Sequence, residues 1–455
     1  MAAVSPARKA AFAVLSAVGR GQSHSDDLLR GKSVAALSAP DRNLATALVL
    51  GVLRWQIQLD DQIQKLLARP GAKLDPEIRI ALRLGAFQLL HLDRIPARAA
   101  IDESVELAKQ AGHRFASGMV NAVLRKLALA PPTQFSEKTA TELALATAHP
   151  VWMVERWTGF YGLEAARTIC RHGQSQPSMV ARVVGAQLEE ELAAAGVGMA
   201  PGELLTSARM VVSGEVADTA AIREGRVWLQ DEGSQLVAEI AGRVQVQRQE
   251  SDGVILDCCA APGGKTLILA ERNPEARVVA CESSAQRLAH MRKRLALLGD
   301  RIECRLADAT SLDEGTAYDL VLADVPCSGT GTLGRNPEIR HRLRVEDLGR
   351  QAERQRGILA AALRSVRPGG RVVYSTCSLE PEENEQVIAA VLAQMPNAHV
   401  VPIRSRIEEM VGEDVLTAPA AERLQSCITP EGFLRLLPGV FRTDGFFIAM
   451  IGRTA

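Results

Sequence analysis

Residues 254–266 read VILDCCAAPGGKT, and this stretch decides the fold class. An apolar run of strand length (254–259) passes directly into a turn of small residues, and a helical pattern follows over 267–271. Small residues between a strand and a helix let a ligand approach the backbone closely. The stretch therefore predicts the first strand–turn–helix unit of an α/β domain, with a ligand site at the turn.

Short apolar runs alternate with helical patterns throughout the chain beyond residue 253. Strands are expected at VILDCC (254–259), VVACE (278–282), IECRLA (302–307), YDLVLADV (318–325), RVVYST (371–376) and FFIAMI (446–451). Such alternation is typical of a mostly parallel sheet with helices on its faces. We expect a Rossmann-like α/β domain over residues 231–455.

The chain before this domain has a different pattern. Residues 1–132 place apolar side chains at spacings of three and four, which predicts an all-α domain. Residues 133–230 are expected to form a linker and a small α+β element. Within it, 131–150 is interpreted as a linker or strap, 151–170 as one helix, and 179–184 and 210–212 as strands.

The composition is that of an ordinary globular protein. The 455 residues are 47% hydrophobic and 23% charged, which suits two or three domains. No apolar run of about 18 residues and no leader-like start are present, so we expect a cytoplasmic protein without a membrane contact. The eight cysteines form no CxxC pair and no zinc spacing, so we expect reduced thiols and no metal.

The net charge of zero hides an uneven distribution. Residues 1–130 carry 18 Lys and Arg against 11 Asp and Glu, whereas residues 131–250 carry 10 against 15. A basic segment on a neutral protein indicates either a contact with a polyanion or a solvated helical surface. Charge alone leaves both interpretations open.

The glycine loop does not have the spacing of a phosphate-binding loop. Four residues must separate the first Gly from the Gly-Lys pair of such a loop, and here that first position is Cys259. An acid, Glu282, ends the second strand, where Rossmann-like sheets hold ribose hydroxyls. Asp308 follows the third strand, where it could meet an adenine amino group. The loop and the two acids together predict an adenosine cofactor.

Two cysteines follow strand ends that should line the cofactor crevice. Cys327 belongs to Asp-Val-Pro-Cys after the fourth strand, and Cys377 to Ser-Thr-Cys after the fifth. A thiolate that adds to carbon-6 of cytosine makes carbon-5 nucleophilic enough to attack a methyl group, and an acid such as Asp324 can assist by protonating N3. No aromatic residue follows Pro326, which argues against methylation of an adenine amino group. These residues alone do not say which cysteine is the nucleophile.

Three stretches resemble the signature motifs of RNA 5-methylcytosine methyltransferases: DCCAAPGGKT (257–266), ADVPCSGTGTLGRNPEIR (323–340) and YSTCSLEPEENE (374–385). In addition, DRNLATALVLGVLRW (41–55), ALRLGAFQLLHLDRIP (81–96) and FASGMVNAVLRKL (115–127) are similar to the NusB-like RNA-binding domain. The combination resembles the bacterial RsmB family of 16S rRNA cytosine-C5 methyltransferases.

The resemblance implies S-adenosylmethionine as the cofactor and assigns roles by motif. Cys377 becomes the nucleophile, Cys327 assists product release, and Asp324 and Lys265 complete the catalytic set. Cofactor-binding residues are implied at Cys259, Ala260, Ala261, Pro262, Gly263, Gly264, Lys265, Glu282, Asp308 and Asp324. The implied partner is 16S rRNA, naked or in an early small-subunit particle, and we expect a monomer.

Other interpretations remain open from the sequence. The same chemistry could act on tRNA, and a cofactor-shaped RNA-binding assembly factor would show a similar pattern. A DNA cytosine methyltransferase is disfavoured because no DNA-recognition region is evident. Arg335 and Arg340 are candidate contacts to substrate phosphates, or else solvated loop arginines.

Overall fold

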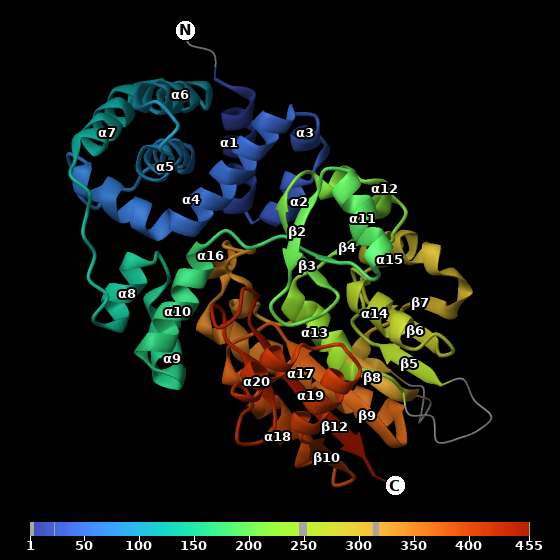
Figure 1. Ribbon diagram of the computed structural model, residues 1–455. Coiled ribbons are helices and arrows are strands. Elements are labelled where there is room, and N and C mark those ends of the chain that lie inside the picture. The colour runs from blue at the N-terminus through green and yellow to red at the C-terminus, as the bar shows by residue number, and fades with distance from the viewer. Residues whose placement is uncertain (1–3, 22, 245–252, 313–317, 455) are drawn as a thin grey trace. The chain divides into compact units, whose positions relative to one another are not determined.

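A computed structural model describes residues 4–21, 23–244, 253–312 and 318–454 (Figure 1). The chain divides into two compact units. Unit 1 comprises residues 1–175 and 333–342, and unit 2 comprises residues 176–332 and 343–455. Each unit is described by itself.

Unit 1 is helical. Its α-helices are α1 (Pro6–Gly19), α2 (Ser25–Leu29), α3 (Lys32–Ala35), α4 (Ala39–Leu66), α5 (Pro76–His91), α6 (Ala97–Gln110), α7 (Ser117–Leu129), α8 (Ala140–Ala146), α9 (Val151–Tyr161), α10 (Leu163–Gln174) and α16 (Ile339–Arg342). Helix α5 packs against α1, α4, α6 and α7, so it is the centre of this bundle (Figure 1). Its apolar side chains belong to one continuous core shared with those helices.

Two expectations for this part of the chain were wrong. The helix expected over 151–170 is two helices, because Gly162 between them has a φ of 83°, a conformation that glycine adopts without strain. The expected linker at 131–150 contains α8, which begins with a capping box between Thr139 and Glu142.

Unit 2 contains a small antiparallel sheet in the order β2-β3-β1-β4. Its strands are β1 (Val180–Arg182), β2 (Gly198–Pro201), β3 (Ala208–Ser213) and β4 (Trp228–Leu229), with helices α11 (Ala186–Ala194) and α12 (Ala220–Arg223) between them. The strands expected at 179–184 and 210–212 correspond to β1 and β3.

The large sheet of unit 2 has the strand path β10-β12-β9-β8-β5-β6-β7, and β11 pairs with β12. The strands are β5 (Val254–Asp257), β6 (Arg277–Glu282), β7 (Ile302–Leu306), β8 (Tyr318–Asp324), β9 (Val366–Thr376), β10 (Ala398–Val401), β11 (Leu434–Leu436) and β12 (Phe446–Arg453). Neighbours from β7 to β9 are parallel, whereas β12 is antiparallel to β9 and to β10. This mixed sheet confirms the predicted α/β fold class.

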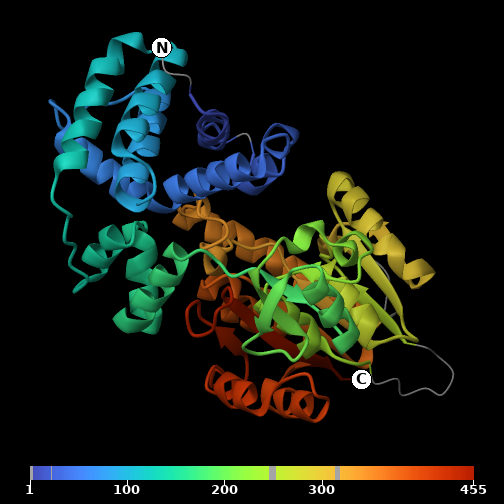
Figure 2. The ribbon, with the colours of Figure 1, turned by 45° about the horizontal axis from the view of Figure 1, so that its top comes forward.

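Helices cover both faces of this sheet, because alternate strand residues point to opposite sides. On β8, Leu320 and Leu322 join a core with helices α13 (Glu232–Ala241), α14 (Gly264–Arg272), α19 (Ile403–Gly412) and α20 (Ala418–Gln425). Val321 and Ala323 face the opposite core with α17 (Val345–Ser365) and α18 (Glu385–Leu392). Figure 2 shows the red-orange helices of residues 403–425 along one side of the sheet. The carboxyl ends of the parallel strands remain free to carry the site loops.

Several predicted boundaries differ from those observed. The strand expected over 254–259 ends at Asp257, and the following helix begins at Gly264 rather than at Leu267. The strand expected over 371–376 begins earlier, at Val366. After β9, Pro381–Glu383 form a single 3-10 turn, Asn384 leaves helical geometry, and α18 follows.

No helix in the described part of the chain is long and apolar enough to cross a membrane. The division into segments 1–132, 133–230 and 231–455 with separate roles remains a prediction.

Candidate active site

The glycine loop follows β5 and borders a pocket of about 100 Å³. Of the seven loop residues predicted to hold the cofactor, all except Gly263 line this pocket, together with Trp228, Asp257 and Asp324. Gly263 has a φ of 102° and precedes α14, so the chain turns sharply into the helix where a side chain would be strained. The loop thus forms a concave surface of backbone and small side chains.

Lys265 and Asp324 form an ion pair in this pocket. The Nζ of Lys265 lies 2.7 Å from Oδ2 of Asp324 and donates to Oγ of Ser234 at 2.8 Å. Burial disfavours the lysine charge, but the Asp324 carboxylate outweighs burial and raises the pKa of Lys265. Oδ1 of Asp324 accepts the hydroxyl of Ser375 at 2.6 Å. Two of the four predicted catalytic residues are therefore in direct contact.

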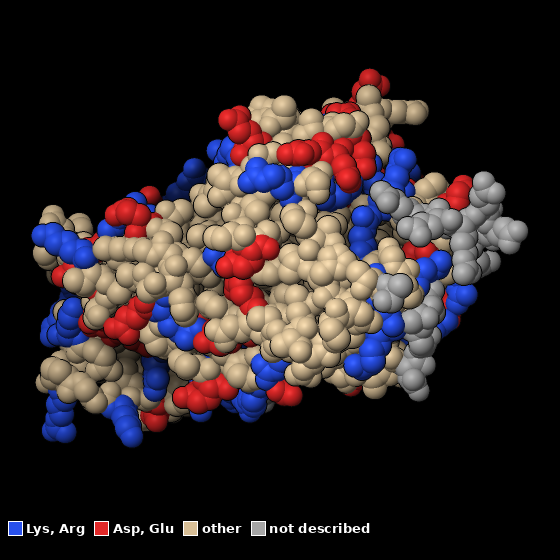
Figure 3. Space-filling model, turned by 90° about the horizontal axis from the view of Figure 1, so that it is seen from below, with Lys and Arg blue, Asp and Glu red and all other residues tan. Residues whose placement is uncertain are grey.

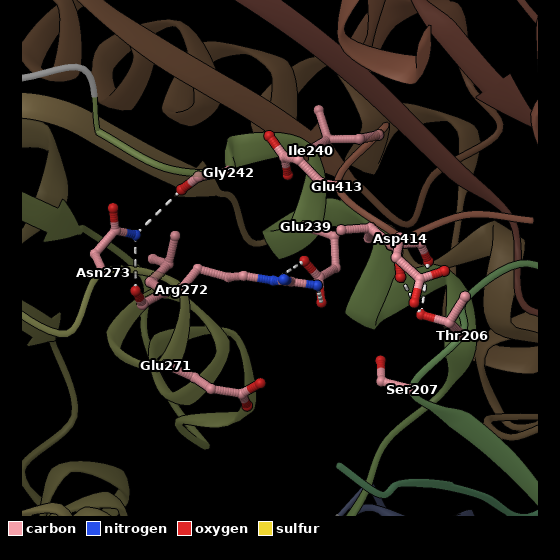
Figure 4. Close-up of polar contacts among 12 residues, drawn as sticks. Thr206, Ser207, Glu239, Ile240, Gly242, Glu271, Arg272, Asn273, Glu413 and Asp414 are labelled. Carbon is pink, nitrogen blue, oxygen red and sulfur yellow. Dashed lines mark hydrogen bonds and ion pairs between the residues drawn. The ribbon is translucent and has the colours of Figure 1, made fainter. Parts of the chain in front are cut away.

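A buried ion-pair network holds α13 and α14 together (Figure 4). Glu239 of α13 is fully buried, and its Oε2 lies 2.6 Å from Nε of Arg272 in α14. Its Oε1 also pairs with Arg182 of β1 at 2.9 Å. Asn273 donates to the carbonyls of Leu269 and Gly242 at 2.9 and 3.1 Å, as Figure 4 shows for the second of these. The helices that carry Ser234 and Lys265 are thus fixed relative to each other.

Asp257 ends β5 next to the loop, and its role was not predicted from the sequence. Its side chain is buried, and the hydroxyl of Thr266 donates to Oδ2 at 2.7 Å. Burial, with a smaller contribution from the charge of nearby Asp324, raises the pKa of Asp257 to about 7. Asp257 is therefore a pocket carboxyl that titrates near neutrality.

Glu282 and Asp308 lie at the ends of the next two strands, as predicted. The buried Glu282 carboxylate accepts the backbone N–H of Ser284 at 2.8 Å and lies 3.4 Å from Nη1 of Arg287. Asp308 accepts the backbone N–H and the hydroxyl of Thr310, and these bonds lower its pKa. Both carboxylates therefore lie beyond the loop, and the bonds to Thr310 favour the ionised form of Asp308.

The two predicted thiols lie side by side. Cys327 follows β8 and Cys377 follows β9, and because these strands are parallel neighbours, the two sulfurs come within 3.3 Å. The contact with Cys377, burial and the charge of Glu383 raise the pKa of Cys327 well above its ordinary value. Cys327 therefore keeps its proton more firmly than an ordinary thiol does.

Bonds between the two loops stabilise this arrangement. The N–H of Gly331 donates to the carbonyl of Cys377 at 2.9 Å, and the N–H of Leu379 donates to the Thr330 hydroxyl at 2.9 Å. The buried Glu383 carboxylate also contacts both loops. Glu383, Ser328 and Ser378 were not predicted from the sequence, although each serine directly follows one of the two cysteines.

The other cysteines divide by burial. Cys258 and Cys281 are buried core residues. Cys304 is only partly buried, because β7 is the edge of the sheet.

Arg340 is not placed to contact a phosphate. Its side chain is buried within unit 1, where it donates to the carbonyls of Arg54, Ala148 and Gly173 at 3.0, 3.2 and 3.1 Å. The interpretation of Arg340 as a candidate substrate contact is therefore wrong. Its guanidinium donates hydrogen bonds to backbone carbonyls inside the helical unit.

The described residues contain no cluster of three or more His, Cys, Asp or Glu side chains placed to hold a metal ion. On the face shown in Figure 3, basic and acidic side chains are interspersed among uncharged ones. That face therefore offers no broad surface of one charge.

Comparisons with known proteins agree with this geometry. Residues 244–452 match the family model of the 16S rRNA methyltransferase RsmB/F, and residues 5–129 match the NusB family. The solved structure of the protein PH0851 covers 99% of this chain and 100% of its own, with a TM-score of 0.79 and 24% identity, and so supports the fold.

Curated relatives extend the match through the whole chain. The probable ribosomal RNA small subunit methyltransferase B of Bacillus subtilis is 34% identical and covers 97% of each chain. The ribosomal RNA small subunit methyltransferase B of Klebsiella pneumoniae is 32% identical, with 97% of this chain and 96% of its own covered. Since these matches run through both the helical and the α/β parts, the chain belongs to the ribosomal RNA small subunit methyltransferase B family.

Proposed function

We propose that this protein methylates carbon-5 of a cytosine in 16S rRNA, with Cys377 as the nucleophile and Cys327 assisting release. The observation that carries the proposal is the 3.3 Å separation of the two sulfurs beside the Lys265–Asp324 pair. Carbon-5 and carbon-6 are adjacent ring atoms, so a reaction that attacks one and deprotonates the other needs two groups this close. Methylation of an exocyclic amine would need neither thiol.

The methyl donor is S-adenosylmethionine. When bound, this cofactor supplies an electrophilic methyl group. The pocket fits its adenosine part, because small residues from Cys259 to Gly264 leave the backbone open. Glu282 supplies an acceptor for ribose hydroxyls and Asp308 one for the adenine amino group. Lys265 of this loop pairs with Asp324, which ends β8 three residues before Cys327.

The first step belongs to Cys377. Its thiolate forms a bond to carbon-6 of the target cytosine, which makes carbon-5 an enamine carbon that can attack the methyl group. Protonation of N3 assists the addition, and Asp324 is the acid placed for it, with its proton supplied from the paired Lys265. The raised pKa of Cys327 keeps the proton on Cys327 during this step.

The second step belongs to Cys327. Once Cys377 is bonded to carbon-6, it no longer presents a thiolate to Cys327, and the largest cause of the raised Cys327 pKa is gone. Cys327 then loses its proton to solvent and accepts the carbon-5 proton. The electrons of that C–H bond restore the ring double bond, Cys377 leaves as a thiolate, and N3 returns its proton to the Asp324–Lys265 pair.

The target base must be turned out of any stack to reach the thiols. Contacts between basic residues of the NusB-like part and rRNA phosphates would orient the RNA. This role rests on the charge surplus of residues 1–130 and on the match to the NusB family.

The test uses 16S rRNA transcript, radiolabelled S-adenosylmethionine and three proteins: wild type, Cys377→Ala and Cys327→Ala. We expect Cys377→Ala to show neither turnover nor adduct, and Cys327→Ala to accumulate a protein–RNA adduct that survives denaturation. Adduct that persists in Cys377→Ala and vanishes in Cys327→Ala would reverse the two roles. If wild type leaves the transcript unmethylated, the assignment of naked 16S rRNA as the substrate is wrong. Assays with tRNA and with immature small-subunit particles would then identify the substrate.

A further inference from the structure

One buried carboxylate, that of Glu383, is bonded to both cysteine loops. Its Oε1 accepts the backbone N–H of Ser328 at 2.8 Å, and its Oε2 accepts the hydroxyls of Ser328 and Ser378. Ser328 directly follows Cys327, and Ser378 directly follows Cys377. A single side chain therefore holds the residue beside each thiol.

Neighbouring bonds close the network around Glu383. The Nε2 of Gln355 donates to Oε1 of Glu383 at 2.9 Å and to the carbonyl of Pro326 at 3.0 Å. The Ser328 and Ser378 hydroxyls lie 3.0 Å apart, and the Tyr374 hydroxyl donates to the Glu383 carbonyl at 2.6 Å. Both the side chain and the backbone of Glu383 are thus fixed.

The Glu383 charge is balanced by neutral donors. Within the described residues, its fully buried carboxylate has no ion pair with Lys, Arg or His. Burying a charge without a nearby cation costs free energy. Such a charge persists only where hydrogen-bond donors bind its oxygen atoms. The donors here come from the two cysteine loops and from Gln355, so the charge and the loop positions depend on each other.

We propose that Glu383 is a positioning residue that sets the separation of the Cys327 and Cys377 sulfurs. This inference rests on the proposed function, because that chemistry requires both sulfurs to reach adjacent ring atoms. Glu383 touches neither substrate nor cofactor and acts through Ser328 and Ser378. A displacement of about 1 Å in such an arrangement can cost about 100-fold in rate.

The decisive variant is Glu383→Gln, which keeps the size of the side chain and replaces one acceptor oxygen by a donor. The new amide would face donors in the loops and push them apart. We expect kcat for methyl transfer to fall about 10- to 100-fold. The KM for S-adenosylmethionine should stay within about twofold, because Glu383 does not line the cofactor pocket. Glu382→Gln, one residue earlier and partly exposed, is the matched control and should keep its turnover.

A second measurement reports the thiol spacing without RNA or cofactor. Phenylarsine oxide bridges two neighbouring thiols, forming two As–S bonds and releasing one water. We expect wild type to bind it through Cys327 and Cys377, with Cys377→Ala as the negative control. Glu383→Gln should bind it at least about 10-fold more weakly, because the sulfurs are no longer held together.

Serine variants test whether Glu383 acts through the loops. Ser328→Ala and Ser378→Ala should each lower kcat, and neither should lower it further in the Glu383→Gln background. Unchanged arsenical affinity and kcat in Glu383→Gln would overturn the inference. A loss of cofactor affinity as large as the loss of turnover would also overturn it, since Glu383 would then support unit 2 as a whole. If wild type fails to methylate cytosine, the proposed function falls, while the arsenical result still decides whether Glu383 sets the spacing.

Discussion

Asp257 ends β5 with its carboxyl buried beside the cofactor loop, and this placement makes stability depend on pH. Burial raises the pKa of Asp257 to about 7, whereas an unfolded Asp has a pKa near 3.9. Between about pH 4 and pH 7 the unfolded chain ionises this residue while the folded chain keeps the proton. The contribution of Asp257 to the free energy of unfolding therefore falls as pH rises through this window, by on the order of 4 kcal/mol in total.

Asp257→Asn removes this titration. We expect the variant to gain stability relative to wild type as pH rises from 5 to 7, and the difference to level off above about pH 7. The nearby charged groups Lys265 and Asp324 are present in both proteins and largely cancel in the difference. Urea unfolding of both proteins at several pH values measures this difference in the free energy of unfolding. A difference that does not change with pH would show that Asp257 has an ordinary pKa in the folded chain.

At this scale, the sequence predicted residues that follow strands within recognisable motifs. Cys327, Cys377, Asp324 and Lys265 all fall in such stretches, and the structure brings them together. Asp257 and Glu383 were not predicted, because their roles depend on burial and on partners that are distant in the sequence. Glu383 and Ser328 are 55 residues apart in the sequence, so no local pattern predicts their hydrogen bond.

The loop after β8 is packed too closely to accept an extra methyl group at Gly331. A Cβ there would lie 2.6 Å from the carbonyl oxygen of Gly445 and 2.8 Å from that of Cys377. Both are backbone atoms and cannot rotate away. We expect Gly331→Ala to lower the free energy of unfolding by about 1–3 kcal/mol and to reduce methyl transfer by displacing the cysteine loops.

Gly349→Ala, within α17, is the matched control for this prediction. Nothing lies within 4 Å of a Cβ at Gly349, and the site is exposed. Alanine is more favourable than glycine within a helix. The free energy of unfolding of this variant should therefore rise by about 0.4–1 kcal/mol, and its activity should be unchanged. Thermal denaturation and methyl-transfer assays measure the stability and activity of the two variants. Equal stability and equal activity would contradict the close packing around Gly331.

Whole elements were predicted well where periodicity was strong. The central strands from β5 to β9 appear where apolar runs alternate with helical patterns, because such runs are buried on both faces of a parallel sheet. The break at Gly162 was missed because one glycine in an apolar periodic stretch does not reveal its φ. The early start of β9 was missed because Pro368 and two glycines interrupt its apolar pattern.

Arg340 links the motif after Cys327 to the interior of the helical unit. It donates to carbonyls of α4, of the segment after α8, and of α10, and burial lowers its pKa to about 9. Arg340→Met would leave these buried carbonyls without their donor. We expect it to lower the free energy of unfolding by at least about 3 kcal/mol, as measured by urea denaturation.

A phosphate contact at Arg340 would behave differently. Its removal would weaken RNA binding and reduce the salt dependence of binding while leaving stability unchanged. Arg98→Met in α6 serves as the control, since the Arg98 side chain is 92% exposed and its loss should change stability by less than about 0.5 kcal/mol. An Arg340→Met protein of normal stability and lowered salt dependence would contradict the burial of this arginine.

For the molecule as a whole, motif order and periodicity predicted a helical part followed by an α/β part. They did not predict that residues 333–342 belong to the helical unit, because that membership depends on buried bonds such as those of Arg340. Nor did they predict that β12 lies antiparallel between β9 and β10. Strand order within a sheet is a long-range property that apolar runs do not encode.

The position of β12 has a consequence for biosynthesis. Gly445, immediately before this strand, donates to the carbonyl of Gly331, whose own N–H holds the carbonyl of Cys377. A nascent chain emerges from the ribosome in order of sequence, so helices α1 to α10 can form while the α/β part is still being translated. The strand beside β9 emerges among the last, and the pair of thiols is therefore assembled only near the end of translation. A ribosomal RNA methyltransferase is thus without this pair of thiols for most of the time that its chain spends on a ribosome.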